Sequence, residues 1–457
     1  MPSPVPRPRG HWLLGHLAEQ RRDPLGLLVR GLREHGDVVG YRFGPYRALQ
    51  LNHPRLIKRV LVDNAANYRK WSALKRARPL LGDGLVLATG ESWKRRRRIY
   101  QPAFRRDRLE AMVPAMVAAT RGLVDHLAGL PDGAEIDLLR EVMRATLSIV
   151  SRTLMSRDIG GFGGFGKDGD EEELGRNFDA AVEAIGRRTL DLNPFAGLLP
   201  TARNRGIRRT IEAIDRQVHR IIAARRASGE PGADLLGWLL ESGEQDGAPV
   251  DDRLLRDEVL NILLAGRGTS AIGLCWMWWL LDRHPEVEAR VREEALAVLG
   301  PDRDPAAGDL DRLDLAARVF QEALRLYPPV WTIARQAIAR DELDGGVPVA
   351  PGTIVLISPY VVHRHPGLWP DPERFDPDRF LPEAVEQRSR LAWIPFGLGP
   401  RTCVGGWFSI QEARILTAMV TRRFRLRAAS PERPGLEPLI TLKPRGGMPM
   451  RVHEVRL

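Results

Sequence analysis

The chain has 457 residues, of which 43% are hydrophobic and 28% charged, as in a globular protein that can bury a large core. Its two cysteines exclude a disulfide framework and indicate a reducing cytoplasm. The net charge of +11 would suit nucleic acid, but no zinc-finger, helix-turn-helix or RNA-binding signature accompanies it. We therefore expect no nucleic-acid partner.

The chain begins with a proline-rich N-terminal arm, residues 1–14. This arm lacks the long apolar run that a membrane span or a secretory signal requires. The sequence thus predicts a soluble, cytoplasmic protein without a membrane span.

Short strands are predicted first, and long helical patterns follow them. The strands lie at residues 38–43 and 48–51, and the helices at about 108–130, 137–155, 203–228 and 253–283. Residues 159–173 are Gly-rich and acidic, which is typical of a mobile loop. The length would allow two or three domains, but no stretch resembles a linker. We expect one mainly α unit, residues 1–457, with small β-sheets.

Residues 396–405, Phe-Gly-Leu-Gly-Pro-Arg-Thr-Cys-Val-Gly, form the most informative motif of the chain. Its glycines let the backbone approach a flat cofactor, and Arg401 favours the thiolate form of Cys403. Cys403 could therefore be a metal ligand, although a lone cysteine is more often a small buried hydrophobe. Cys275 lies in an apolar run, and we interpret it as a core residue.

The pattern F-x-x-G-x-R-x-C-x-G is complete in this motif, and it resembles the haem-ligand loop of the cytochrome P450 family. The resemblance extends from residue 15 to residue 444. It implies the cytochrome P450 fold, with a long central helix over haem b, and Cys403 as the axial ligand of the iron. Phe396 and Gly405 would belong to the same cofactor-binding loop.

A second motif, Glu322-Ala-Leu-Arg325, places a carboxylate and a guanidinium on one helix face. Its apolar neighbours predict burial, and a buried pair is costly unless a further donor completes it. Arg374 could supply that donor. The resemblance implies that Glu322, Arg325 and Arg374 lock the core around the haem loop and are structural.

Trp93 and Arg97 lie four residues apart on a predicted helix and so share one face. The resemblance assigns them to the haem propionates, together with Arg335 and Arg401. Four donors facing two carboxylates would offset the cost of burying them. For Trp93 alone, a core aromatic residue is an equally good interpretation.

Within the long helix, residues 265–270 read Ala-Gly-Arg-Gly-Thr-Ser. In the family, the threonine matched by Thr269 holds dioxygen and ordered water, and an acid usually stands where this chain has Gly268. Either Gly268 makes room for a bulky substrate or kinks the helix, or the oxygen chemistry is altered. We expect the catalytic residues of this helix to be Thr269, Gly268 and Ser270. Arg267 could face away from the pocket or bind an anionic substrate.

The resemblance also implies a substrate pocket that is mainly apolar. It would be lined by the loop of residues 71–87, by residues 330–334 and 439–441, and in particular by Ala265, Gly266, Val330, Trp331, Ile333 and Ile440. Trp331 could narrow this pocket toward a compact ligand, and any of these residues could be plain core.

Taken together, the sequence predicts a haem-thiolate monooxygenase of secondary metabolism that inserts one oxygen atom of O2 into a hydrophobic molecule. A terpenoid, a macrolide or other polyketide, or a fatty-acid-like compound would fit. Electrons would come from NAD(P)H through a reductase and an acidic ferredoxin or flavodoxin, docking near the basic run 93–98 and Arg105 and Arg106. A peroxide-using or electron-independent enzyme, or a non-catalytic haem sensor, is the alternative.

Overall fold

The computed structural model describes residues 5–158, 177–178, 180–187, 201–229, 232, 234–245 and 251–455. The loop predicted at residues 159–173 lies outside these ranges. The chain divides into two compact units: unit 1 comprises Met1–Leu74 and Gln321–Cys403, and unit 2 comprises Lys75–Phe320 and Val404–Leu457. A single domain therefore stays a prediction.

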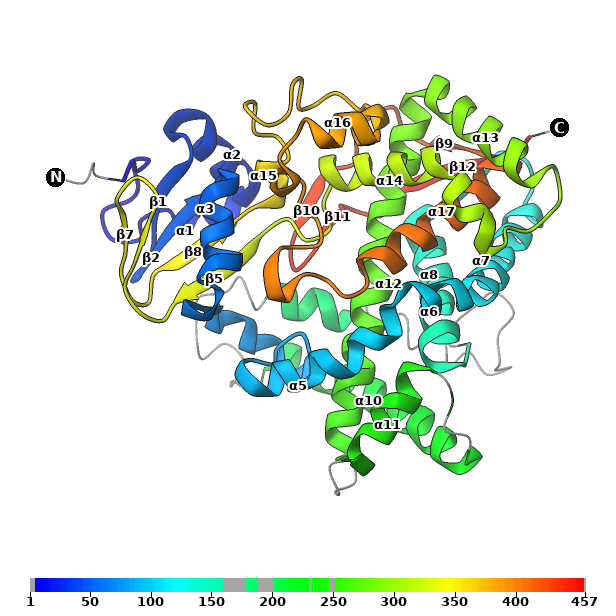
Figure 1. Ribbon diagram of the computed structural model, residues 1–457, viewed down its shortest axis with the longest axis horizontal. Coiled ribbons are helices and arrows are strands. Elements are labelled where there is room, and N and C mark those ends of the chain that lie inside the picture. The colour runs from blue at the N-terminus through cyan, green and yellow to red at the C-terminus, as the bar shows by residue number, and fades with distance from the viewer. Residues whose placement is uncertain are drawn as a thin grey trace. The chain divides into compact units, whose positions relative to one another are not determined.

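Unit 1 is built on a five-stranded sheet with the strand order β1-β2-β8-β5-β3 (Figure 1). Strands β2 and β8 are parallel, and the other neighbours are antiparallel. The strands are β1 (Val38–Phe43), β2 (Tyr46–Leu51), β3 (Tyr68–Lys70), β5 (Ile333–Ala337) and β8 (Ile354–Ile357), with a separate hairpin of β6 (Asp341–Leu343) and β7 (Val347–Val349). The predicted strand at 38–43 is confirmed, and the one at 48–51 begins two residues earlier.

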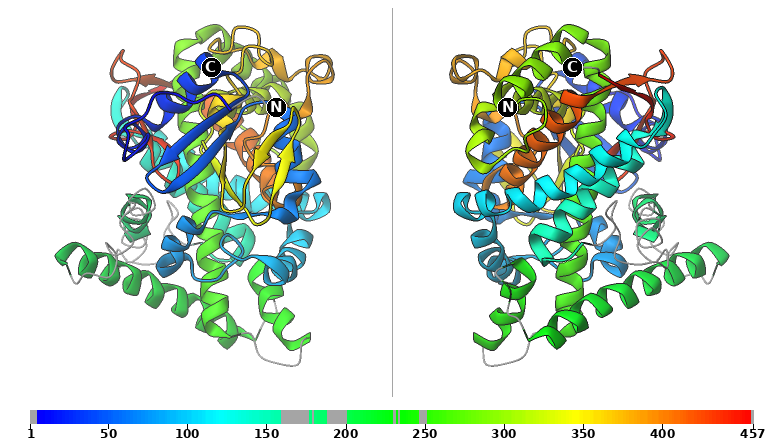
Figure 2. Two further views of the ribbon diagram at one scale, coloured as in Figure 1. Left: turned by 90° about the vertical axis from the view of Figure 1, so that its left-hand side faces the viewer. Right: turned by 90° about the vertical axis from the view of Figure 1, so that its right-hand side faces the viewer.

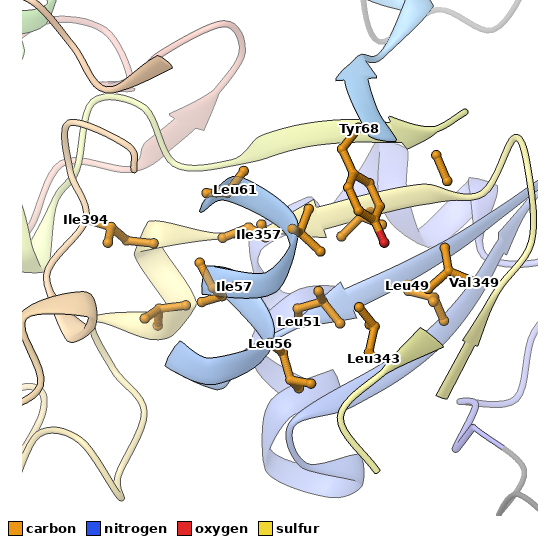
Figure 3. Close-up of a cluster of buried hydrophobic side chains, with 14 residues drawn as sticks. Leu49, Leu51, Leu56, Ile57, Leu61, Tyr68, Leu343, Val349, Ile357 and Ile394 are labelled. Atoms are coloured by element: carbon orange, nitrogen blue, oxygen red, sulfur yellow. The ribbon is translucent and has the colours of Figure 1, made fainter. Parts of the chain in front are cut away.

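Helix α3 (Pro54–Lys58) packs on this sheet, and a cluster of buried hydrophobic side chains fills the space between them (Figure 3). Leu51, Ile57 and Ile357 are fully buried at its centre. The helices of unit 1 are α1 (Leu17–Arg22), α2 (Pro24–His35), α3 (Pro54–Lys58), α15 (Pro359–Val362) and α16 (Pro382–Glu386). Burial of such side chains is the main force that holds this unit together.

Unit 2 is mainly helical, and its longest helix, α12, runs through its middle (Figures 1 and 2). Its helices are α4 (Arg78–Leu81), α5 (Gly90–Tyr100), α6 (Arg106–Ala111), α7 (Val113–Ala128), α8 (Leu138–Met155), α10 (Ala202–Ser228), α11 (Leu235–Gln245), α12 (Asp252–Arg283), α13 (Pro285–Leu299) and α17 (Gly406–Arg423). Helix α14 (Asp314–Leu326) passes from unit 2 into unit 1.

Side-chain caps explain where three of the predicted helices begin. Asp137 accepts a hydrogen bond from the Leu139 N–H at the start of α8, and Thr201 and Asp251 cap α10 and α12 in the same way. The segment predicted to be helical at 108–130 is helical as expected, but it is divided into two helices, because α6 ends at Ala111 and α7 restarts with a proline in its first turn.

Two small sheets complete unit 2. One has the order β4-β12-β9 and the other pairs β10 with β11. These strands are β4 (Ala134–Asp137), β9 (Phe424–Ala428), β10 (Leu436–Pro438), β11 (Leu442–Pro444) and β12 (Pro449–Glu454). Helix α12 is the one described helix that is long and apolar enough to cross a membrane, but 72% of its most apolar window is buried, as in the core helix of a soluble protein. A mainly α fold with small sheets is thus confirmed.

Candidate functional site

In unit 1, Cys403 ends a tight loop whose geometry depends on glycine. The Cys403 N–H donates to the Phe396 carbonyl at 2.8 Å, which closes the loop. Gly397 and Gly399 have φ angles of +75° and +74°, and a Cβ on Gly399 would lie 1.9 Å from the Leu61 carbonyl oxygen. A side chain at Gly399 would therefore displace the loop that presents Cys403.

The two cysteines lie in opposite environments. Cys403 is exposed, whereas Cys275 is fully buried within α12. Burial raises the pKa of the Cys275 thiol well above its ordinary value, so this residue stays a neutral thiol. The interpretation of Cys275 as core is confirmed, and the buried-hydrophobe alternative for Cys403 does not fit its exposure.

Three cationic side chains converge in unit 1, and one of them was not predicted from the sequence. Strand pairing places Lys70 of β3 directly opposite Arg335 of β5. Burial, with repulsion from Arg401 and Arg335, lowers the pKa of Lys70 to about 7. Burial and Arg401 likewise lower the pKa of Arg335 to about 10. Like charges opposite each other in a sheet are destabilising, so this cluster favours an anionic ligand.

This cluster of Lys70, Arg335 and Arg401 fits the carboxylates of a haem. Two propionate groups would offset the repulsion among the three cations and would be held by charge-assisted hydrogen bonds. Among the described residues, no group of three or more His, Cys, Asp or Glu side chains could hold a metal ion.

Glu322 and Arg325 form a fully buried ion pair in unit 1, with the Arg325 Nε 2.6 Å from a Glu322 oxygen. Arg325 also donates to the carbonyls of His363, Pro372 and Arg374, at 2.6–3.0 Å. The expected donation by the Arg374 side chain is wrong, because Arg374 is exposed and contributes only its carbonyl.

The remaining donors to Glu322 come from nearby in the chain. The Asp376 N–H donates to Glu322 at 3.0 Å, and the Arg379 guanidinium lies 3.6 Å away. A pair surrounded by this many partners fixes the position of the segment that leads to the Cys403 loop. The sequence motif pointed to Arg374 alone, and the proximity of Arg379 to Glu322 is seen only in the folded chain.

In unit 2, the basic run on α5 divides into buried and exposed members. Arg96 is buried and forms an ion pair with Glu258 at 2.7 Å, and Tyr100 donates to the same carboxylate at 2.8 Å. Trp93 and Arg97 are half-buried on one face of α5, as their spacing predicts. The run is therefore only partly a solvated surface, because Arg96 anchors α5 to α12.

Helix α12 continues without interruption through its glycines and presents an open face. Ala265, Gly268 and Thr269 share this face, and a Cβ on Gly268 would meet nothing within 4 Å. The Thr269 hydroxyl donates to the Ala265 carbonyl at 2.6 Å. The helix thus continues across Gly268, and the glycine leaves space beside Thr269.

The opposite side of α12 is packed against α8. A Cβ on Gly266 would lie 2.5 Å from a Val150 methyl group, and the Thr146 hydroxyl donates to the Arg267 carbonyl at 2.8 Å. Arg267 is buried, with 9% exposure, on the side turned away from the open face. Gly266 therefore allows close helix packing, and its place in a pocket lining stays a prediction.

A small polar cluster joins α12 to α17. The Ser270 and Ser409 hydroxyls lie 3.1 Å apart, and the neighbouring Glu412 is fully buried. Burial raises the pKa of Glu412 to about 8, opposed only partly by the Ser270 hydroxyl, and neither carboxyl oxygen makes a hydrogen bond of ordinary geometry. Glu412 was missed in the sequence because nothing in its surrounding residues indicates burial beside Ser270.

The N-terminal half of α12 holds the loop before α5. Three α12 side chains accept hydrogen bonds from backbone N–H groups of this loop. Asp257 accepts from Asp83 at 2.8 Å, Glu258 accepts from Leu85 at 3.0 Å, and Asn261 accepts from Val86 at 2.9 Å. Gly82 and Gly84 permit this approach, because a Cβ on either would collide with Asp257 or Asn261. Part of the predicted pocket loop, residues 71–87, is thus fixed to α12.

The remaining pocket residues differ in exposure. Val330 and Ile440 are 38% and 37% exposed, and Ile333 is half-buried. Trp331 is only 3% exposed, and its carbonyl accepts a hydrogen bond from the Ser358 hydroxyl at 2.6 Å. For Trp331 the core interpretation therefore fits better than a role in narrowing a pocket.

Comparison with known proteins gives one consistent result. The sequence model of the family "Cytochrome P450" matches residues 5–449. Cyclooctatin synthase of Streptomyces melanosporofaciens is 35% identical, covering 92% of this chain and 89% of its own length. Cyclooctat-9-en-7-ol 5-monooxygenase of the same species is 35% identical (91% and 88%), and pentalenene oxygenase of Streptomyces avermitilis is 34% identical (91% and 89%).

Proposed function

The chain belongs to the cytochrome P450 family, and we propose that it uses the haem cofactor and monooxygenase activity of this family to oxidise a terpenoid. The choice of a terpenoid substrate rests on the names of the three Streptomyces relatives, which refer to cyclooctatin compounds and to pentalenene. The open face of α12 supports it: Ala265 and Gly268 are small and apolar, and Thr269 adds a single hydroxyl group. A compact hydrocarbon would fit such a surface better than a charged molecule.

We assign the haem-binding roles unit by unit. In unit 1, Cys403 would ligate the iron, and Lys70, Arg335 and Arg401 would hold propionate groups. In unit 2, the resemblance implies that Trp93 and Arg97 would have the same propionate role. When bound, the haem supplies the iron centre at which O2 is reduced, and a thiolate ligand favours O–O cleavage over reversible oxygen binding.

The overall reaction sets what the protein must provide. One oxygen atom enters a substrate C–H bond to give an alcohol, and the other leaves as water, which consumes two electrons and two protons per O2. Thr269 would hold the oxygen side of the site through its hydroxyl group. Gly268 has no side chain that could supply these protons, so they would come through water or through another side chain.

We propose that Glu412 takes this proton role through Ser270 and Ser409. Glu412 is an acid that is neutral at physiological pH, because burial raises its pKa to about 8. The two serine hydroxyls lie 3.1 Å apart beside it, and Ser270 directly follows Thr269 in α12. A carboxyl group with a pKa near the operating pH is suited to proton transfer.

The electrons would come from NAD(P)H through a reductase and an acidic ferredoxin or flavodoxin in the cytoplasm. On unit 2, the Arg105 and Arg106 side chains are 72% and 81% exposed. Trp407 is 73% exposed and lies four residues after Cys403. Arg105 pairs with Asp107, and Arg106 pairs with Glu110 and Asp311. Tryptophan and arginine are enriched at protein-binding hot spots, and the net charge of +11 favours an acidic partner.

The test uses the purified, haem-loaded protein. Cyclic terpenes and terpene alcohols, macrolides and fatty acids are titrated while the Soret band is recorded, and the compounds that shift it are then incubated with ferredoxin, reductase, NADPH and 18O2. We expect terpenoids to shift the band and to yield alcohols that carry one 18O atom.

Other outcomes would support other functions. Product formation with peroxide alone, and none with O2 and the redox proteins, would favour the electron-independent alternative. Ligands that shift the spectrum but are never turned over would favour a haem sensor. Selective binding and turnover of fatty acids or macrolides would refute the terpenoid proposal while leaving the monooxygenase family intact.

A further inference from the structure

Three consecutive large apolar side chains protrude into solvent near the start of unit 1. Trp12, Leu13 and Leu14 are 78%, 57% and 42% exposed. They lie in a turn from His11 to Gly15, which we call the apolar turn. Scattered exposed apolar residues are ordinary in soluble proteins, but three adjacent ones that include a tryptophan indicate contact with something outside the chain.

The apolar turn is held rigidly. The His11 and Gly15 backbones exchange two hydrogen bonds of 2.8 and 2.9 Å, and the His11 Nδ1 accepts from the N–H groups of Leu13 and Leu14 at 3.2 Å. The Arg42 guanidinium of β1 donates to the carbonyls of His11 and Trp12. The three side chains are thus presented outward by a fixed backbone.

Glycine is required where the apolar turn meets the sheet. Gly15 has φ +62°, and a Cβ there would lie 2.1 Å from the Arg42 carbonyl oxygen. The His16 N–H donates to the same carbonyl at 2.7 Å. Because the turn is ordered before any partner binds, little conformational entropy is lost on binding.

Positive charge borders the apolar turn in the sequence on both sides. Arg7 and Arg9 precede it, Arg21 and Arg22 follow it, and all four are exposed. The nearby carboxylates of Glu19 and Asp23 both form ion pairs with Arg30. Arg7, Arg9 and Arg22 therefore place exposed cationic side chains close in the sequence to an aromatic and aliphatic protrusion.

We propose that the apolar turn is an interfacial anchor that docks the protein on an anionic lipid bilayer without spanning it. Tryptophan prefers the interface between headgroups and acyl chains, and leucine inserts just below it. Each arginine near an anionic leaflet adds attraction that falls off within a Debye length. A protruding apolar tip flanked by cations matches a lipid surface, whereas a protein partner would have to supply a complementary groove.

The experiment measures co-sedimentation of the haem-loaded protein with vesicles of phosphatidylglycerol and phosphatidylcholine, and with vesicles of phosphatidylcholine alone. Variants Trp12→Asp and Leu13→Asp are compared with Trp407→Asp. Trp407 is a matched control, because it is a tryptophan of similar exposure, 73%, on unit 2. A blue shift of tryptophan fluorescence that Trp12→Asp abolishes would locate the inserted residue.

We expect the wild type to bind phosphatidylglycerol vesicles and to bind them less at high salt. Trp12→Asp and Leu13→Asp should weaken binding more than about tenfold, and Trp407→Asp should not. The proposal is overturned if the wild type stays in the supernatant, or if all three variants bind as the wild type does. It is also overturned if Trp12→Asp instead converts a dimer to a monomer, because the turn would then be an interface between two copies.

Discussion

At the scale of single residues, the environment decides what each side chain can do. Cys403 and Cys275 are chemically identical, but only Cys403 is exposed in a glycine loop, while Cys275 is held neutral by burial. Glu412 is an acid whose burial keeps it protonated near neutral pH. The exposure of Cys403 bears on the absorption spectrum of the haem-loaded protein, and the burial of Glu412 bears on how the stability of the fold depends on pH.

Replacement of Cys403 by serine should remove the thiolate ligand. The reduced protein exposed to carbon monoxide should lose its strongly red-shifted Soret band, because a serine hydroxyl does not supply the electron density of a thiolate. Cys275→Ala serves as the control and should keep the band. A spectrum that is indifferent to Cys403→Ser would remove the chemical basis for this assignment.

Replacement of Glu412 by glutamine should change how stability depends on pH. The folded chain keeps the Glu412 proton up to about pH 8, whereas the unfolded chain loses it near the ordinary pKa of 4.5. Between these values the folded state binds more protons, so the wild type loses stability as the pH rises. Glutamine cannot ionise and should escape this loss, which would reach about 3–5 kcal/mol by pH 8.

Urea unfolding of both proteins from pH 4 to pH 9 would check this prediction. The two stabilities should run parallel at the acid end and diverge toward pH 8, with the variant the more stable. Parallel curves throughout would show that Glu412 titrates normally. In the same variant, slower product formation at unchanged substrate affinity would support the proton role.

At the scale of elements, α12 combines two glycines with different functions. Gly266 lets α12 approach α8, because a Cβ there would lie 2.5 Å from Val150. Gly268, two residues later, has open space around its Cβ position. The helix also holds the preceding loop through Asp257, Glu258 and Asn261. One element thus fixes the positions of two predicted parts of the pocket.

The two glycines predict opposite effects of the same mutation. Gly266→Ala should destabilise the fold by about 1–2 kcal/mol, because overpacking against Val150 outweighs the gain in helix propensity. Gly268→Ala should stabilise it by up to about 1 kcal/mol, because alanine favours the helix and meets no neighbour. Urea unfolding at equal haem content gives both values. Equal effects at the two positions would contradict this account of α12.

Sequence patterns predicted elements better than they predicted contacts between elements. The capped ends of α8, α10 and α12 could be predicted because the caps are local. The Cys403 loop could be predicted because its pattern is contiguous. Lys70 and Glu412 could not, since their importance depends on side chains brought close only by strand pairing or helix packing.

The same reasoning explains the errors at this scale. Arg374 and Arg379 both follow Glu322 in the sequence, and only the folded loop places the guanidinium of Arg379 near its carboxylate. Residues 108–130 have the helical pattern throughout, but the proline at the start of α7 divides them. For Trp331 the sequence left both interpretations open, and its burial in the structure favours the core.

At the scale of the whole molecule, the net charge of +11 should affect how an electron carrier reaches the protein. The exposed Arg105 and Arg106 belong to a segment that packs on α17, since Phe104 and Phe408 stack edge to face with centroids 6.1 Å apart. Phe408 is next to Trp407. The exposed arginines and the exposed indole are therefore neighbours in the sequence of two aromatic rings that contact each other within unit 2.

Reversal of this charge should slow reduction of the haem by an acidic ferredoxin. In the double variant Arg105→Glu and Arg106→Glu, stopped-flow reduction should be slower by about tenfold or more at low salt, because electrostatic steering raises association rates by that order. Rising ionic strength should slow the wild type and should reduce the difference between the two proteins. The dithionite-reduced spectra should be identical.

The control is a double variant with the same change of charge at another exposed site, on α10. Arg208 and Arg209 are exposed on α10, and the double variant Arg208→Glu and Arg209→Glu lowers the net charge equally. If attraction by the whole molecule is enough, both variants will slow reduction to the same extent. If the carrier docks at the surface around Trp407, only the Arg105 and Arg106 variant will slow reduction. In that case Trp407→Ala will raise the carrier concentration needed for half-maximal reduction, and the salt dependence will remain.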